Sequence, residues 1–266
     1  MNTGLSELER AARISQAVTD IKQALAGAGL VVAIDGPSGS GKSSVAKKVA
    51  AELGLGYFDT GAIYRAATWW MVENGIDLAD QDLVAQRLTE WPLRQELDPL
   101  EPWIWVNGVD VSDAIRQSVI SEQVSKIATN LGARAKLVDL QQRVVRAQLE
   151  PAGWARGRGV VAEGRDITTV VAPDAQARIL LTASEAARLA RRALEVHGTA
   201  DAAALAATTA QVSGRDAQDS KVAQFMTAPD GVTAIDSSDL DFDQTVVAVL
   251  EEISRQVIST SQRLAE

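Results

Sequence analysis

The 266-residue sequence predicts an α/β protein in which one parallel sheet carries helices on both faces. Two observations lead to this fold class. Short apolar runs typical of buried strands alternate with helical stretches, and a glycine-rich G-x-x-x-x-G-K-S motif follows the first run and precedes a helical pattern. The apolar runs occupy residues 30–34, 56–58, 159–162, 177–182 and 232–235.

Residues 1–29 read as a helical extension in front of the sheet. Ser6 and Glu9 stand at the spacing of a capping box, and apolar side chains recur three and four residues apart in one narrow stripe. An Ala-Gly-Ala-Gly run at residues 26–29 ends the pattern. Because the stripe is too short to indicate a coiled coil, we expect the helix to pack on its own domain, with a partner-binding or dimer helix as the alternative. The stripe consists of Ala11, Ile14, Val18, Ile21 and Leu25.

The glycine-rich motif predicts a phosphate-binding loop. Its glycines let backbone N–H groups turn towards a polyphosphate, and the N-terminus of a helix over residues 43–53 adds partial positive charge. Lys42 can then reach the β- and γ-phosphates of a nucleotide, and the Ser43 hydroxyl can hold Mg²⁺. The motif reads Gly36-Pro37-Ser38-Gly39-Ser40-Gly41-Lys42-Ser43.

Composition excludes several kinds of chemistry. The chain has no cysteine and a single histidine, His197, which leaves no disulfide, thiolate nucleophile, Ser/His triad or histidine metal cluster to build. No apolar run reaches the length of a membrane span and no secretory leader opens the chain, so we expect a cytoplasmic protein without a membrane partner. The formal net charge of −9 opposes binding to nucleic acid.

The long interval between the second and third strands predicts an inserted subdomain at residues 80–111, extending towards 150. Residues 103–111 read as a strand, an Asn-Gly turn and a second strand, which is typical of an antiparallel hairpin. Helical patterns follow over residues 112–130 and 133–149.

Arginine-containing segments follow the predicted strands, at the sheet edge where parallel α/β proteins bind ligands. Each arginine alone could be a surface ion pair, but four clusters around one phosphate loop favour a site for phosphate groups. The loop by itself does not separate kinases from GTPases, ATPases or passive nucleotide binders, although the guanine-reading N-K-x-D segment is absent from the sequence. The clusters are residues 59–65, 163–166, the set Arg188, Arg191 and Arg192, and residues 215–219.

These segments resemble those of the bacterial cytidylate kinases. The likeness implies a three-layer P-loop nucleoside monophosphate kinase core over residues 30–266, with a five-stranded parallel sheet of order 2-3-1-4-5. It also implies that residues 80–111 form a monophosphate-binding subdomain and that residues from about 185 to 222 form a short mobile lid. The matching stretches follow the family's order through residues 31–250: residues 33–43, 59–65, 108–112 with Ile115-Arg116, 163–166, 170–175, and Arg215-Asp216 with Asp219-Ser220.

The resemblance implies an ATP-dependent phosphotransferase of pyrimidine metabolism that converts CMP and dCMP to their diphosphates by in-line transfer. ATP would be held by Gly36, Pro37, Ser38, Gly39, Ser40, Gly41, Lys42, Ser43 and Ser44, with Mg²⁺ on Ser43. The monophosphate would contact Thr60, Arg65, Ser125, Arg134, Arg165, Asp166, Arg215 and Asp219. Charge stabilisation during transfer would come from Lys42, Arg165, Asp166, Arg188 and Arg192.

The chemistry of cytosine agrees with this assignment. Its amino group, ring nitrogen and carbonyl can be recognised by a hydroxyl, a carboxylate and a guanidinium. These groups are supplied by Ser125, Asp166 and Arg134. Uracil carries a carbonyl in place of the amine, so a buried carboxylate there disfavours UMP. The 5′-phosphate would be bound by Arg65, Arg165 and Arg215.

The chain departs from the family pattern at three positions. Val222 stands where an arginine is usual, Thr168 where a glycine is usual, and Ala172 where a phenylalanine is usual. These departures concern acceptor affinity and turnover more than fold. Two alternatives therefore stay open: a kinase for another small phosphoryl acceptor, and a nucleotide-binding scaffold without turnover whose N-terminal helix is the partner surface. We expect a monomer.

Overall fold

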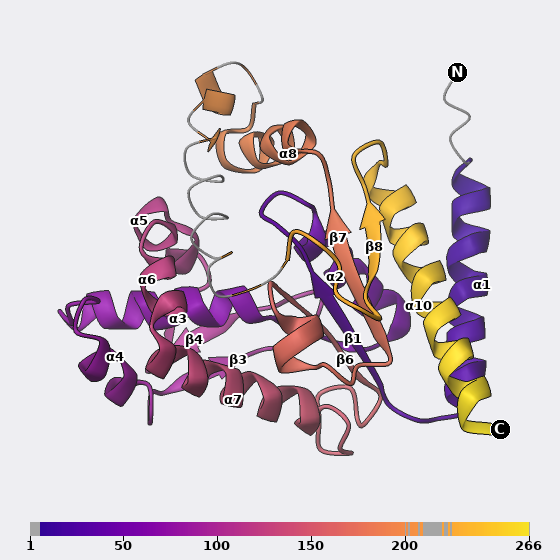
Figure 1. Ribbon diagram of the computed structural model, residues 1–266, viewed down its shortest axis with the longest axis horizontal. Helices are drawn as coiled ribbons and strands as arrows, with labels where there is room; N and C mark the ends of the chain where they lie inside the picture. Colours follow the sequence, from indigo (N-terminus) through magenta and orange to yellow (C-terminus); the bar gives the residue numbers. More distant parts are fainter. Residues whose placement is uncertain are drawn as a thin grey trace.

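Five parallel strands form the central sheet of the computed structural model (Figure 1). The structure describes residues 6–199, 201, 203–206, 208–209, 220, 223 and 225–265. The sheet order is β2-β6-β1-β7-β8, which is 2-3-1-4-5 when the five core strands are counted along the chain, so the predicted order is confirmed. The strands are β1 (Leu30–Asp35), β2 (Gly56–Asp59), β6 (Gly159–Gly164), β7 (Ala177–Thr182) and β8 (Thr233–Asp236).

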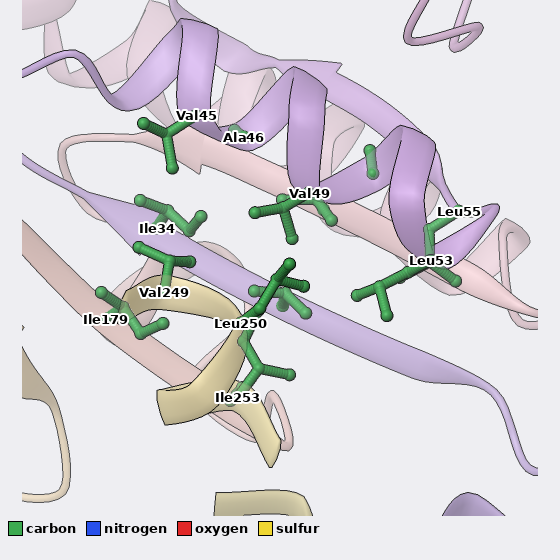
Figure 2. Packing of buried hydrophobic residues seen from close by; sticks show 14 of the residues in the cluster. Ile34, Val45, Ala46, Val49, Leu53, Leu55, Ile179, Val249, Leu250 and Ile253 are labelled. Carbon is green, nitrogen blue, oxygen red and sulfur yellow. The ribbon is translucent and has the colours of Figure 1, made fainter. Parts of the chain in front are cut away.

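Helices cover both faces of this sheet. All six residues of β1 are buried, and because strand side chains alternate, Val32 and Ile34 pack on one face while Val31 and Ala33 pack on the other. The first face is covered by α2 (Lys42–Leu53) and α10 (Phe242–Ala265); Figure 2 shows Val49 of α2 and Leu250 of α10 meeting over it. The second face is covered by α3 (Thr60–Glu73), α4 (Gln81–Arg87), α6 (Val124–Thr129) and α7 (Leu131–Ala147).

The N-terminal helix α1 (Glu7–Leu25) lies alongside α10 (Figure 1). Its expected capping box is present: Ser6 and Glu9 exchange hydrogen bonds at the first turn. Ile21 is buried against the core cluster, and Arg13 of α1 pairs with Glu251 of α10 at 2.6 Å. The apolar stripe of α1 therefore lies against the same chain.

A small antiparallel sheet stands beside the core. It has the order β3-β4-β5 and consists of β3 (Leu93–Gln95), β4 (Ile104–Val106) and β5 (Val109–Asp110). The turn at Asn107 and Gly108 has φ of 52° and 78°, as a two-residue hairpin requires, so the predicted hairpin is confirmed. Strand β3 was missed, because a three-residue strand gives almost no periodic signal.

The segment predicted to be helical over residues 112–130 is helical, but it forms short separate helices rather than one continuous helix. The segment forms η1 (Ala114–Arg116), α5 (Ser118–Ser121) and α6, with Gln117 in an extended conformation between the first two. Its apolar residues pack in two different clusters. Ile115 packs with the small sheet, whereas Val124 and Ile127 pack with α3 and α7. A straight helix could not reach both clusters.

Candidate active site

The phosphate loop joins the end of β1 to the start of α2. Gly41 caps α2 with φ of 87°, and Gly39 has φ of 76°, a left-handed conformation that other residues rarely adopt. A Cβ atom at Gly39 would also lie 2.4 Å from the carbonyl oxygen of Arg188. Lys42 extends back over the loop, where its Nζ donates to the Pro37 carbonyl at 3.4 Å. The sequence motif thus adopts the turn that its glycines predict.

A cavity of about 530 Å³ opens over this loop. Carboxyl ends of the core strands form its floor, since Asp59 closes β2 and Glu163 lies near the end of β6. Basic side chains from five different parts of the chain line it, which makes it suited to a highly charged anion. The lining is Ser38, Gly39, Gly41, Lys42, Ser43, Ser44, Asp59, Gly61, Arg65, Arg116, Ser121, Glu163, Gly164, Arg165 and Arg192.

Glu163 lies at the base of the cavity in direct contact with the loop. The Ser43 hydroxyl donates to Glu163 Oε1 at 2.7 Å, and the Tyr57 hydroxyl donates to the same oxygen at 3.2 Å. Burial raises the pKa of Glu163, and the charge of neighbouring Asp59 raises it further, against the lowering effect of Lys42. The loop serine and a carboxylate therefore form one oxygen-rich corner of the cavity.

Asp59 pairs with the arginine that follows it on α3. Arg65 Nη2 donates to Asp59 Oδ2 at 3.0 Å, and Asp59 also caps α3 by accepting from the Ala62 N–H. Burial alone would raise the pKa of Asp59, but Arg65, the Ala62 N–H, Arg116 and Lys42 outweigh it, so the pKa is lowered. Arg65 Nε is buried without a hydrogen-bond partner in the part of the chain that the structure describes. This guanidinium is held in place with donor capacity left for a ligand.

A second, smaller pocket of about 60 Å³ adjoins the cavity. Asp166 is buried here and forms an ion pair with Arg134 of α7. The Arg165 guanidinium lies 4.4 Å from the centre of the buried Phe225 ring and belongs to the lining of both pockets. The lining of the small pocket is Thr60, Gly61, Tyr64, Val124, Ala128, Arg134, Gly164, Arg165, Asp166 and Ala223.

Arginines of helix α8 (Glu185–His197) approach the loop from its other side. Arg188 is buried and donates to the Ser38 carbonyl at 3.0 Å. Arg191 donates to the Ser40 carbonyl at 3.3 Å and to the Ser237 carbonyl at 2.6 Å, which ties α8 to the loop and to the end of β8. Arg192 lines the cavity itself.

Most of the predicted site residues come together around the two pockets. Thr60 lines the small pocket and donates its hydroxyl to the Glu163 carbonyl at 2.8 Å. Ser125 is buried on α6, but it is its neighbours Val124 and Ala128 that line the small pocket. Arg215 and Asp219 lie outside the described residues, as does Val222.

Sequence reasoning assigned no role to four residues that shape the site. Glu163 and Asp59 stand inside the quoted motifs and were passed over in favour of their arginine neighbours, although their places at the ends of adjacent strands could have identified them. Arg116 was quoted without a role and lines the cavity. The role of Arg191 in fixing α8 depends on contacts with residues far away in the sequence, which no local pattern indicates.

Two kinds of feature are missing from the described residues. None of their helices is long and apolar enough to cross a membrane. They also hold no group of three or more His, Cys, Asp or Glu side chains arranged to bind a metal ion.

Comparison with known proteins assigns the chain to a family. The family model described as "Cytidylate kinase" matches residues 32–255. The chain is 42% identical over 223 residues to the "Cytidylate kinase" of Streptomyces avermitilis, covering 83% of this chain and 91% of that protein. It is 44% identical over 223 residues to the protein of the same name from Streptomyces coelicolor, with the same coverage.

A "Bifunctional pantoate ligase/cytidylate kinase" from a Synechococcus species is 40% identical over 232 residues, which cover 85% of this chain and 44% of that protein. The residues that the family model matches, 32–255, contain the phosphate loop, the cavity carboxylates and the Arg134–Asp166 pair. Sequence, sheet order and site geometry agree, and the chain therefore belongs to the cytidylate kinase family of kinases.

Proposed function

We propose that this kinase transfers the γ-phosphoryl group of ATP to the 5′-phosphate of CMP and dCMP, giving CDP or dCDP and ADP. The junction between the two pockets carries the proposal, because Gly164 and Arg165 belong to both linings. The phosphate loop bounds one pocket, and the Arg134–Asp166 ion pair bounds the other. A donor in the first and an acceptor in the second would meet at Arg165. The names of the relatives support the same acceptor.

The reaction would be an in-line displacement at the γ-phosphorus. An oxygen of the CMP phosphate forms the new P–O bond, and the oxygen that bridges the β- and γ-phosphorus leaves with ADP. The acceptor phosphate is already ionised near neutral pH, so no side chain has to remove a proton from it. We propose that the negative charge on the transferring phosphoryl group is stabilised by Lys42, Arg165 and Arg192. Arg188 would fix the loop through Ser38.

The donor atoms in the cavity suit Mg²⁺. The Ser43 hydroxyl and the carboxylates of Glu163 and Asp59 line it together, and these hard oxygen donors are the kind that Mg²⁺ prefers. Ser43 would hold the ion, with Glu163 and Asp59 accepting hydrogen bonds from its waters. When bound, Mg²⁺ neutralises charge on the β- and γ-phosphates.

The smaller pocket would hold the cytosine base. Arg134 and Asp166 orient each other, so a buried carboxylate and a guanidinium face the ligand with little freedom to rearrange. Ser125 would add its hydroxyl, and Thr60 would contact the ligand beside Gly164. Arg65 and Arg165 would take the 5′-phosphate, since both line the larger cavity next to Gly61. Arg215 and Asp219 would complete the acceptor site.

Two segments would move during the reaction. Residues 80–111, with the elements that follow towards 150, would close over the acceptor, and residues 185–222 would act as the lid. Closure excludes water, which would otherwise accept the phosphoryl group. The N-terminal extension would stabilise the domain through α10, and the protein would act as a monomer.

A panel of monophosphates tests the proposal. Purified protein is incubated with ATP, Mg²⁺ and each of CMP, dCMP, UMP, AMP and GMP, and diphosphate formation is measured. We expect kcat/KM for CMP and dCMP to exceed that for the other three by about 100-fold or more. Similar turnover of all five contradicts the proposal. Transfer to a non-nucleotide acceptor alone indicates a different kinase, and ATP and CMP binding without transfer indicates a scaffold.

A further inference from the structure

Asp35 links the phosphate loop to the segment that carries the acceptor-site residues. It is the last residue of β1, directly before Gly36, and its side chain is buried with 1% exposure. Its carboxylate accepts three hydrogen bonds from one short stretch of chain. The donors are the Ile167 N–H at 2.8 Å, the Thr168 N–H at 2.9 Å and the Thr168 hydroxyl at 2.6 Å.

The stretch held by Asp35 follows Arg165 and Asp166 immediately. It opens η2 (Ile167–Val171), a single π-helical segment, and the Asp166 carbonyl accepts from both Val170 and Val171 inside that segment. The first N–H groups of such a segment have no partner within it. The Asp35 carboxylate supplies that partner. The backbone after Asp166 is therefore held both by Asp35 and by the hydrogen bonds within η2.

A second contact fixes the chain on the other side of Arg165 and Asp166, at Gly164. The Gly36 N–H donates to the Gly164 carbonyl at 3.3 Å, and Asp35 and Gly164 are register partners in the parallel pair β1–β6. Arg165 and Asp166 therefore lie between two attachments to the beginning of the phosphate loop. One attachment is backbone only, and the other depends on the side chains of Asp35 and Thr168.

We propose that Asp35 and Thr168 are a positioning pair that fixes Arg165 and Asp166 relative to the phosphate loop. This inference rests on the proposed function, in which Arg165 lies between donor and acceptor and Asp166 contacts the base. In this chain the side chain of Thr168 adds a third bond to the attachment. Neither residue touches the reacting groups; both act through the backbone between them.

Thr168→Val tests the pair without removing the backbone N–H donors, because valine keeps the branched shape and replaces the hydroxyl with a methyl group that cannot donate. We expect KM for CMP to rise roughly five- to twenty-fold, since small misplacements of binding groups are costly, while KM for ATP changes by less than about twofold. Thr168→Ser restores the hydroxyl and should return KM for CMP to within about twofold of the native value. The matched control is Thr245→Val, which removes another buried hydroxyl, one that donates to the Asp241 carbonyl at 2.7 Å, on α10.

Hydrogen exchange gives a readout that does not depend on which acceptor is used. Amides in peptides covering residues 163–170 should exchange faster in Thr168→Val and in Asp35→Asn, and at the native rate in Thr245→Val. Unchanged exchange there, equal increases in KM for CMP and ATP, or failure of Thr168→Ser to restore KM would each overturn the inference.

The two proposals fail separately. If the native protein does not phosphorylate CMP, the proposed function fails, and the positioning pair is then judged by exchange at residues 163–170. If the native protein phosphorylates CMP and Thr168→Val does so with native KM, the positioning pair alone fails.

Discussion

The Ser43 hydroxyl donates a 2.7 Å hydrogen bond to the buried carboxylate of Glu163. This bond joins the first turn of α2 to β6, across 120 positions of sequence, and Tyr57 holds the same carboxylate oxygen from β2. The hydroxyl that we propose as a ligand of Mg²⁺ is thereby oriented beside a carboxylate. A contact between a core strand and the loop thus fixes the orientation of this hydroxyl in the cavity.

Glu163→Gln should weaken the use of Mg²⁺. Glutamine keeps an oxygen acceptor for Ser43 and removes the negative charge, so we expect kcat to fall roughly 10- to 100-fold and the half-saturating Mg²⁺ concentration to rise. Kinetics across a Mg²⁺ titration and calorimetry of ATP binding with and without Mg²⁺ measure both effects. Glu52→Gln, which alters the α2 partner of Lys48, is the control. A fall in kcat with unchanged Mg²⁺ dependence would contradict the assignment.

Lys42→Ala should abolish most of the transfer rate while leaving acceptor binding intact. Lys42 lines the cavity over the loop, where we propose that charge develops during transfer. We expect kcat to fall by about 100-fold or more, with the Kd for CMP changed by less than about threefold. Single-turnover kinetics and calorimetry make the comparison, with Lys48→Ala on the outer face of α2 as the control. Equal losses in both variants would argue against a direct role.

Asp166→Asn should reduce discrimination between cytosine and uracil. The substitution removes the charge from the Arg134–Asp166 pair inside the smaller pocket. We expect kcat/KM for CMP to fall by about 100-fold and the CMP-to-UMP ratio to fall with it. Asp139→Asn breaks an exposed ion pair with Arg143 and should leave both quantities unchanged. An unaltered ratio in Asp166→Asn would exclude this carboxylate from base reading.

Asp35 should make the protein less stable as the pH rises. Burial raises the pKa of its carboxyl to about 6, hydrogen bonds from Thr168 and Ile167 oppose the increase, and the charge of Asp166 adds to it. In the unfolded chain this carboxyl titrates near its ordinary pKa of about 4. Between these pKa values the folded state binds more protons, so the free energy of unfolding falls as the pH rises, by about 3 kcal/mol for this group.

Denaturant unfolding of the native protein and of Asp35→Asn across this pH range measures the effect. Between about pH 4 and pH 7, the unfolding free energy of the native protein should fall relative to that of Asp35→Asn. A difference that stays constant across that range would show that the carboxyl titrates alike in both states.

Ile21→Ala should destabilise the protein without altering its kinetics. Ile21 is buried between α1 and the core, so the substitution leaves a cavity, and we expect a loss of about 2–4 kcal/mol in unfolding free energy. Leu8→Ala, at a side chain that is 84% exposed on the same helix, should change it by less than about 0.5 kcal/mol. Thermal and denaturant unfolding measure stability, and the standard CMP assay measures activity. Normal stability in Ile21→Ala would mean that α1 is dispensable to the fold.

Much of the architecture could be predicted because it depends on neighbours in sequence. The capping box at Ser6, the turn at Asn107 and Gly108 and the loop glycines each rest on interactions that span a few residues. The apolar runs identified all five core strands, and the resemblance supplied their order. The break at Gln117 could not be predicted, because it depends on which distant cluster each apolar side chain enters.

The phosphate loop, the core strands and most residues around the site could be read from the chain before its structure was known. How those residues are held depends on long-range packing: Glu163 holds Ser43, Asp35 holds the segment after Asp166, and Arg188 and Arg191 hold the loop carbonyls. The physical reason is distance along the chain. Asp35 and Thr168 are 133 positions apart, and their contact exists only because β1 and β6 pair in one register.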